Sequence, residues 1–133
     1  MSVLRFSISI EKGLLEKLDR ITHDLHFPNR SRTIRFLVNQ FSVKKARKEN
    51  QHVAGAIILV YDHHQRELQT QSTHLQHDYH GLILSVQHVH LDNDKCLETL
   101  AVKGKAGDLE LLANQLISLK GIQYGTLVIT ETL

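Results

Sequence analysis

The sequence contains one cysteine, one proline and no tryptophan, and aromatic residues make up only 5% of its 133 positions. A single cysteine, Cys96, excludes the framework of intrachain disulfides that small secreted domains use. No run approaches the ~20 apolar residues of a transmembrane helix, and the first residues lack the apolar stretch of a signal peptide. These absences predict a cytoplasmic protein that does not span a membrane and whose cysteine is reduced.

The near-neutral total charge combines two unlike parts. Residues 1–50 contain 11 Lys and Arg against 5 Asp and Glu, whereas residues 51–133 contain 5 against 9. Eight of the 10 histidines lie between residues 52 and 90. With 41% hydrophobic residues the composition is that of a folded protein, and disordered and collagen-like classes are excluded. A basic module of about 50 residues rarely buries enough surface to be stable alone, so we expect it to need a partner chain.

The first part has the pattern of one strand followed by two helices. Residues 3–10 alternate strictly between a polar and an apolar side, which predicts a half-buried strand. Apolar residues at helical spacing then predict helices over residues 12–25 and from about residue 30 to residue 48, with Asn29 and Ser31 suited to cap the second. A lone strand leaves an unpaired edge, and pairing it with its copy in a second chain removes that edge.

The second part predicts a β-α-β-β-α-β order, which is the ferredoxin-like arrangement. The expected strands are residues 52–62, 81–92, 95–104 and 122–130. The expected helices are residues 65–76 and 107–121, the second carrying leucines at helical spacing. The predicted fold class is therefore α+β, with a small β-α-α module before a larger sheet domain.

A histidine pair and the single cysteine form the strongest chemical motif. The two-residue period of a strand places His88 and His90 on one face, and Cys96 opens the neighbouring antiparallel strand. Two imidazoles and a thiolate suit Ni(II), Cu(II) or Zn(II) better than Mg(II) or Ca(II). Three ligands leave a position for an open site or for a further histidine, of this or another chain. The nearby histidines are His74, His77 and His80.

The polar side of the first strand carries Arg5, Ser7 and Ser9. Arginine reads guanine with two hydrogen bonds and serine contacts any base, so two such strands side by side suit the DNA major groove. A solvated strand face would have the same pattern, but the basic first part favours DNA. Small dimeric proteins of the Arc and MetJ type read DNA with this layout.

Four motifs in order carry a resemblance to a known family: RFSISI, NRS, YDHHQREL and HVHLDNDKCLE. With them, the sequence resembles the nickel-responsive transcriptional regulators of the NikR type over nearly its whole length. The resemblance implies a ribbon-helix-helix DNA-binding domain at residues 1–48 and an ACT-like metal-binding and tetramerisation domain at residues 52–133. It further implies a homotetramer that binds a double-stranded DNA operator, most simply as a repressor of nickel-uptake or other nickel-related genes.

The same resemblance assigns residue roles. It implies one Ni(II) per subunit in square-planar coordination, held by His88, His90 and Cys96 of one chain and by His77 of its neighbour. The residues expected to orient these ligands are Tyr61, Gln76 and Glu98, and the possible accessory metal ligands are His63 and His64. Arg5, Ser7 and Ser9 would read bases, and the expected backbone contacts come from Arg30, Ser31 and Arg66.

The sequence departs from the family at two positions. Some family members carry acidic residues one and five positions after the residue matching Ser31, where they help to hold a cation between the domains. Here these positions are Arg32 and Phe36. A guanidinium repels a cation, so Arg32 argues against such an ion site in this protein. Arg32 can instead supply its own positive charge to the contact between the two domains.

Alternative functions remain open at the level of sequence. A ribbon-helix-helix regulator whose ACT-like domain senses an amino acid would share the fold, with incidental histidines. A metalloenzyme with an open three-ligand site is disfavoured because no Glu or Asp is placed as a general base, and we predict that the protein is not an enzyme. An antitoxin would explain only residues 1–50. By ligand type alone, Cu(II) should bind at least as tightly as Ni(II).

Overall fold

The computed structural model describes residues 2–131, and the chain divides between Phe41 and Ser42 into two compact units. The sequence predicts a boundary between residues 48 and 52, so the observed division falls earlier, inside the second helix. Over the described residues no helix is both long and apolar enough to cross a membrane.

The first unit contains α1 (Lys12–Asp24) and the start of α2 (Arg30–Lys48), which confirms both predicted helices. Asn29 begins α2 because its side-chain oxygen accepts the Arg32 backbone N–H at 2.9 Å. The two helices are joined by a hydrogen bond between the Thr22 and Thr33 hydroxyls at 2.6 Å. These polar contacts hold the helix pair with little buried apolar surface.

The strand predicted over residues 3–10 is absent from the single chain, where these residues have no regular secondary structure. The physical reason is that a strand is defined by its ladder of hydrogen bonds, and the chain provides no neighbouring strand for this segment. Phe6 is 74% exposed and Ile8 63% exposed, so the apolar side of the segment is uncovered.

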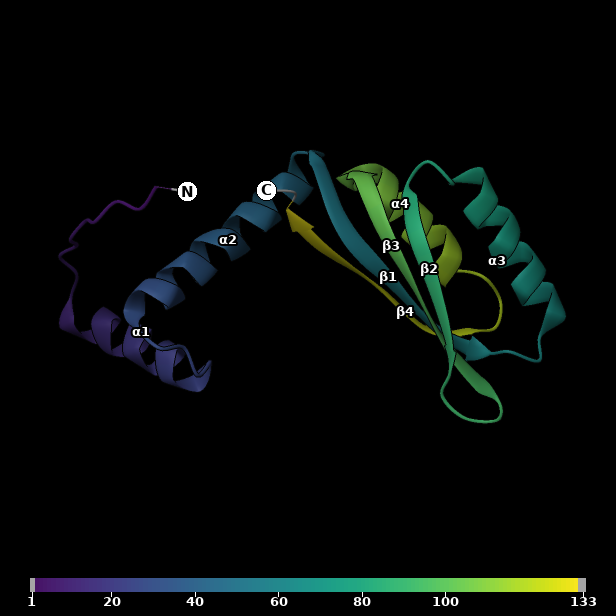
Figure 1. Ribbon diagram of the computed structural model, residues 1–133, viewed down its shortest axis with the longest axis horizontal. Helices are drawn as coiled ribbons and strands as arrows, with labels where there is room; N and C mark the ends of the chain where they lie inside the picture. Colours follow the sequence, from purple (N-terminus) through teal and green to yellow (C-terminus); the bar gives the residue numbers. More distant parts are fainter. Residues whose placement is uncertain (1, 132–133) are drawn as a thin grey trace. The chain divides into compact units, whose positions relative to one another are not determined.

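The second unit is built on a four-stranded antiparallel sheet with the order β2-β3-β1-β4 (Figure 1). Its elements are β1 (His52–Asp62), α3 (Arg66–Asp78), β2 (Ile83–His90), β3 (Lys95–Lys105), α4 (Ala106–Ile117) and β4 (Ile122–Glu131). The order in the chain and in the sheet confirms the ferredoxin-like prediction, with bounds close to those expected.

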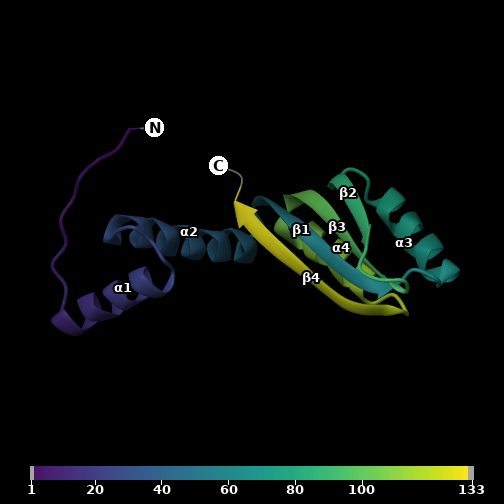
Figure 2. The same ribbon diagram turned by 60° about the horizontal axis from the view of Figure 1, so that its bottom comes forward.

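Both helices of this unit lie on one face of the sheet, as Figures 1 and 2 show. Leu59 of β1, Leu100 of β3 and Leu112 of α4 have no exposed surface and form the centre of the core. Within the described part of the second unit, no helix covers the opposite face of the sheet, and Tyr124 and Val128 are exposed on β4.

The last turns of α2 belong to the second unit. Ala46 is buried, and Arg47 forms an ion pair with Glu110 of α4. Asn50, which follows α2, accepts the Gly107 backbone N–H at 2.7 Å with its side-chain oxygen and so satisfies the first turn of α4. The residues after α2 are therefore bound to the sheet unit.

Candidate metal centre

The register of three strands gathers the predicted site residues at one end of the sheet. His90 of β2 and Tyr61 of β1 both lie opposite Cys96 of β3, and His88 lies opposite Glu98. Residues that face each other in an antiparallel pair share a face, as do residues two apart on one strand. All five side chains therefore project from the face that carries α3 and α4.

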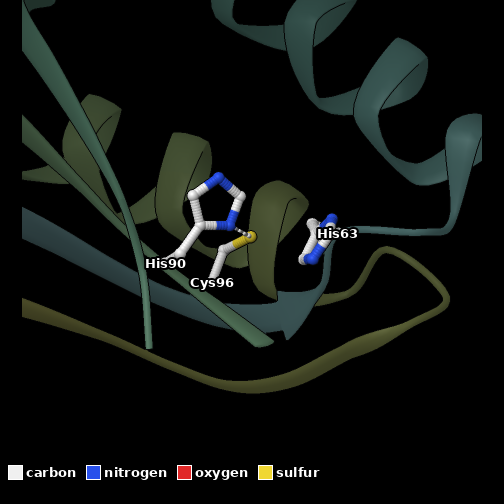
Figure 3. Close-up of side chains that lie close together, drawn as sticks. All are labelled: His63, His90 and Cys96. Atoms are coloured by element: carbon white, nitrogen blue, oxygen red, sulfur yellow. Dashed lines mark hydrogen bonds between the residues drawn. The ribbon is translucent and has the colours of Figure 1, made fainter. Parts of the chain in front are cut away.

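Three potential metal ligands come together in this region (Figure 3). His63, His90 and Cys96 place their ligand atoms within 4.8 Å of one another. His90 directs Nδ1 toward the Cys96 sulfur at 3.9 Å, and the ring centroids of His63 and His90 are 4.8 Å apart. Cys96 is fully buried, His63 partly exposed and His90 exposed, so the ligands lie where the core meets solvent.

The other two predicted nickel ligands lie outside this group. The ring of His88 is next to that of His90, with centroids 5.5 Å apart, and also meets the edge of Tyr61 at 6.0 Å. His77 is exposed on α3, where its ring stacks on His80 at 6.0 Å. The structure therefore brings together His90 and Cys96, as the sequence pattern predicts. The third member of the group, His63, lies in the turn directly after β1.

Tyr61, Gln76 and Glu98, predicted to support the site, form one hydrogen-bonded network. The Tyr61 hydroxyl donates to one oxygen of Glu98 at 2.6 Å, and the Gln76 amide donates to the other at 2.8 Å. Gln76 also donates to the Ser72 hydroxyl at 3.1 Å. Glu98 is only 5% exposed, and burial together with its carboxylate raises the pKa of Tyr61 well above the usual range. The phenol therefore remains a hydrogen-bond donor.

Ser72 is a further member of this network, and the sequence motifs did not predict it. It lies one helical turn before Gln76 on α3 and is buried, which is unusual for a serine in a polar helix. The spacing of four residues was a usable signal, because it places both side chains on the same helix face.

The electrostatics of the site favour a protonated thiol at Cys96. Burial, followed by the carboxylates of Asp62, Glu98 and Asp92, raises the pKa of this thiol. A divalent cation would be attracted by the same carboxylates and would displace the thiol proton. A thiol beside imidazole nitrogens fits nickel and other borderline or soft metal ions, which prefer nitrogen and sulfur ligands.

The residues predicted to contact DNA are on the surface. Arg5, Ser7 and Ser9 are exposed in the irregular first segment, and Ser31 is exposed in the first turn of α2. Arg66 is exposed at the first residue of α3, in the sheet unit. Arg30 is exposed as well, but its guanidinium makes two hydrogen bonds to Asp19 at 2.7 and 3.0 Å and so connects α1 to α2.

The two positions that depart from the family pattern form an aromatic cluster with Phe27. The Arg32 guanidinium lies over the ring of Phe27 at 4.8 Å, and the rings of Phe27 and Phe36 meet edge to face at 5.4 Å. A stacked guanidinium and two aromatic rings offer no oxygen ligands to a cation. Arg32 and Phe36 thus pack on Phe27 within the first unit.

Comparisons with known proteins agree with this chemistry. The family described as the NikR C-terminal nickel-binding domain matches residues 54–130. A nickel-responsive regulator of Syntrophus aciditrophicus is 45% identical, with the match covering 96% of this chain and 93% of the relative. A nickel-responsive regulator of Pyrococcus abyssi is 44% identical, covering 99% of this chain and 96% of the relative.

A similar solved structure supports the fold of the sheet unit. An uncharacterized protein of Thermotoga maritima superposes with a TM-score of 0.54 at 15% identity, covering 59% of this chain and 98% of that protein. A lower similarity is found to the ACT domain of the GTP pyrophosphokinase of Chlorobium tepidum, with a TM-score of 0.49 at 13% identity, covering 58% of this chain and 86% of that domain.

Proposed function

The chain belongs to the family of nickel-responsive regulators, and from that premise we propose that it is a nickel-dependent DNA-binding transcriptional regulator. A regulator family also agrees with the prediction that the chain is not an enzyme. The observation that carries the proposal is the approach of His90 Nδ1 to Cys96 Sγ at 3.9 Å, at the rim of the core. This pair is the start of a nitrogen and sulfur donor set for a borderline metal ion.

The nickel centre that we propose uses His88, His90 and Cys96 of one chain and the partner subunit's His77. The exposure of His77 and its separation from the His63–His90–Cys96 group support a role toward another chain. Nickel bound there would polarise its ligands and join two chains. The network of Tyr61, Gln76 and Glu98 would hold the surrounding side chains in place, since such contacts tune metal affinity.

A centre that joins chains requires an oligomer, for which we propose a homotetramer with one Ni(II) per subunit. The exposed apolar residues on the open face of the sheet, Tyr124 and Val128 among them, support further contacts between subunits. The whole assembly is expected in the cytoplasm, where operator DNA is found.

DNA binding is assigned to residues 1–48, which we propose form a ribbon-helix-helix domain in a dimer. Two copies of residues 3–10 can pair as antiparallel strands and bury Phe6 and Ile8, which are 74% and 63% exposed in the single chain. The opposite side of this ribbon would present Arg5, Ser7 and Ser9 of both chains to the bases of the operator.

Phosphate contacts are assigned to Ser31 at the start of α2 and to Arg66 at the start of α3, both exposed. Arg30 keeps one guanidinium nitrogen outside its two hydrogen bonds to Asp19, so it can contact a phosphate while the ion pair persists.

We assign residues 52–133 to an ACT-like domain, which would form the regulatory core of the protein.

Nickel would act by favouring one arrangement of the subunits. A ligand shifts a conformational equilibrium only through its difference in affinity between the two states, and couplings of this kind are typically ~1–3 kcal/mol. An ion that bonds to two chains binds only the arrangement that brings them together. In that arrangement the DNA-binding dimers would match the spacing of the operator half-sites, and repression of nickel-uptake genes would follow.

The decisive experiment is a fluorescence anisotropy titration of the purified protein with promoter DNA of a nickel-uptake gene, with and without Ni(II). We expect Ni(II) to tighten binding by about 5–150-fold, the range of such couplings. Cys96→Ala should remove this effect and keep the metal-independent binding. Nickel dependence that survives Cys96→Ala would contradict the proposal, as would DNA binding that responds to an amino acid instead.

A further inference from the structure

We propose that Asn50 is a positioning residue for nickel-dependent DNA binding. With Ser42 and Arg47 it forms a latch, called the α2 latch below, which holds the end of α2 on the sheet unit and passes changes in that unit on to α2. The inference rests on the proposed function, because the response that Asn50 would position is the effect of Ni(II) on DNA binding. The contacts that form the latch all lie within the second unit.

Helix α2 belongs to both units. It runs from Arg30 to Lys48, and the division of the chain falls between Phe41 and Ser42. Its first turn contains Ser31, to which a phosphate contact is assigned above. The helix contains neither proline nor glycine, the residues at which helices most often kink. Restraining the last turns of such a helix also restrains the turns before them, so the latch would act on the DNA-binding residues without contacting DNA.

Two side chains hold the last turns of α2 to different elements of the sheet unit. The Ser42 hydroxyl donates to the carboxylate of Glu131 at the end of β4, and the Arg47 guanidinium pairs with Glu110 of α4. Ala46, one turn after Ser42 and therefore on the same helix face, is 3% exposed. These turns of α2 are thus packed against the sheet unit and bonded to it at two points.

Asn50 ends α2 and caps α4 at the same time. Its φ of +54° lies in the left-handed region, which asparagine adopts more readily than most residues, and the Gln51 backbone N–H closes the helix on the Ala46 carbonyl at 3.0 Å. The Asn50 side-chain oxygen accepts the Gly107 N–H at 2.7 Å. Lys105, the residue before α4, makes no side-chain hydrogen bond to the first turn, so Asn50 supplies the cap from another element.

Gly107 allows the close approach of Asn50. A Cβ atom added at Gly107 would lie 2.9 Å from the Asn50 side-chain oxygen, which is too close for an ordinary contact. The neighbouring Ala106 N–H donates to the Gln51 carbonyl at 3.0 Å, so two consecutive N–H groups of α4 are satisfied by Asn50 and Gln51. The latch therefore has two discrete states, because the Gly107 N–H bonds either to Asn50 or to water.

Strand β3 connects the latch to the proposed nickel centre. Cys96 is the second residue of β3 (Lys95–Lys105), and α4 begins directly after the last one, with no loop between them. The strand is paired on both sides, with β1 and with β2, and its Leu100 has no exposed surface. A closely packed strand transmits a displacement, so a shift of Cys96 on binding an ion would reach Ala106 and Gly107. Nickel would favour the closed latch if it binds that state more tightly, since this difference is what shifts an equilibrium.

The first test measures the affinity of the full-length protein for promoter DNA with and without Ni(II), by fluorescence anisotropy. Asn50→Gly keeps the left-handed backbone and removes the side-chain oxygen, so the ratio of the two affinities should fall by about 2–10-fold, the equivalent of one hydrogen bond. Asn50→Asp keeps an acceptor oxygen and should retain the wild-type ratio. Asn39→Ala, which changes an exposed asparagine in the middle of α2, is the matched control and should leave the ratio unchanged.

Gly107→Ala opens the latch from the other side. The added Cβ displaces the Asn50 side chain, so the ratio should fall by a similar factor. Alanine is a better helix former than glycine, so α4 is retained and its unfolding cannot explain the loss. A readout without nickel comes from hydrogen exchange of the metal-free protein, followed by NMR. The Gly107 amide should exchange at least about threefold faster in Asn50→Gly than in the wild type.

The outcomes separate the latch from the proposed function. A wild-type ratio in both Asn50→Gly and Gly107→Ala would overturn the positioning role and leave the proposed function standing, as would an unchanged exchange rate of the Gly107 amide. A wild-type protein whose DNA binding ignores Ni(II) would overturn the proposed function and the positioning role together, and faster exchange in Asn50→Gly would then leave the latch as a structural contact. Circular dichroism of each variant verifies that the fold is retained.

Discussion

The two units of the chain differ in how much of their own apolar surface they cover. From residue 2 to Phe41, Thr33 is the only buried residue that the structure describes, and α1 has none. The sheet unit buries side chains of β1, β3 and α4 completely. The contrast shows that a sheet covered by helices on one face builds a hydrophobic core within one chain. The irregular first segment and the two helices of the first unit instead leave their apolar side chains exposed.

The largest expected effect comes from removing a side chain from the centre of the sheet unit. Leu112→Ala should lower the free energy of unfolding by about 2–5 kcal/mol, because it leaves a cavity among fully buried neighbours. Leu111→Ala, on the same helix but 50% exposed, should change it by less than about 1 kcal/mol. Urea denaturation measures both, and equal effects would contradict the core described for α4.

The first unit should respond in DNA binding rather than in the stability of the sheet unit. Phe6→Ser removes apolar surface that the proposed ribbon buries in both chains, and we expect operator affinity to fall by about 100-fold. Phe6→Leu keeps an apolar side chain and should retain most of the affinity. Anisotropy titrations give the affinities, and a Phe6→Ser protein that binds like wild type would rule out burial of this side chain.

A smaller effect is expected from the polar network beneath the metal centre. Tyr61→Phe removes the hydroxyl that donates to Glu98 and leaves a buried carboxylate oxygen without that partner, at a cost of about 1–3 kcal/mol. Tyr124→Phe is the matched control, because Tyr124 is 60% exposed on the open face of the sheet. Thermal unfolding compares them, and a difference near zero would show that the network adds no stability.

The smallest effect concerns the ion pair between the helices of the first unit. The Arg30 guanidinium lowers the pKa of Asp19, so this pair stabilises the folded form at neutral pH, and the contribution is lost as the pH falls through the lowered pKa. Asp19→Asn should therefore reduce the loss of helix packing between pH 7 and pH 3. Circular dichroism at both pH values tests this, and the effect should shrink in high salt because both groups are exposed.

Local patterns in the sequence were enough to predict the sheet unit. The apolar run of β1, the two-residue period of β2 and the leucine spacing of α4 are intrinsic to each segment, so six elements were located in order. The period of β2, together with the short turn to β3, also predicted that His90 and Cys96 lie near the same face. Residues 3–10 show the limit of this reasoning, because the partner that would make them a strand is in another chain.

The place of His63 could not be derived from the sequence pattern. Its approach to His90 depends on how the loop after β1 docks on the β2–β3 hairpin through Asn93 and Asp94, which are about 30 residues away in the sequence. No periodicity links a loop to a hairpin over that distance. The end of the first unit at Phe41 depends on the same kind of information, since the burial of Ala46 and the ion pair of Arg47 within the sheet unit are tertiary.

The buried Glu98 has a consequence for charge balance. Both of its oxygens accept hydrogen bonds, as expected of an ionised carboxylate, and it is 5% exposed. In the proposed nickel centre, a divalent ion bound by neutral imidazoles and one thiolate would keep a single positive charge, which the Glu98 carboxylate would offset. The carboxylates of Asp62 and Asp92 are also near the Cys96 thiol, so a monovalent ion would leave more uncompensated negative charge there than a divalent ion would. The charge of this region would therefore select for the valence of the ion as well as for its ligand preference.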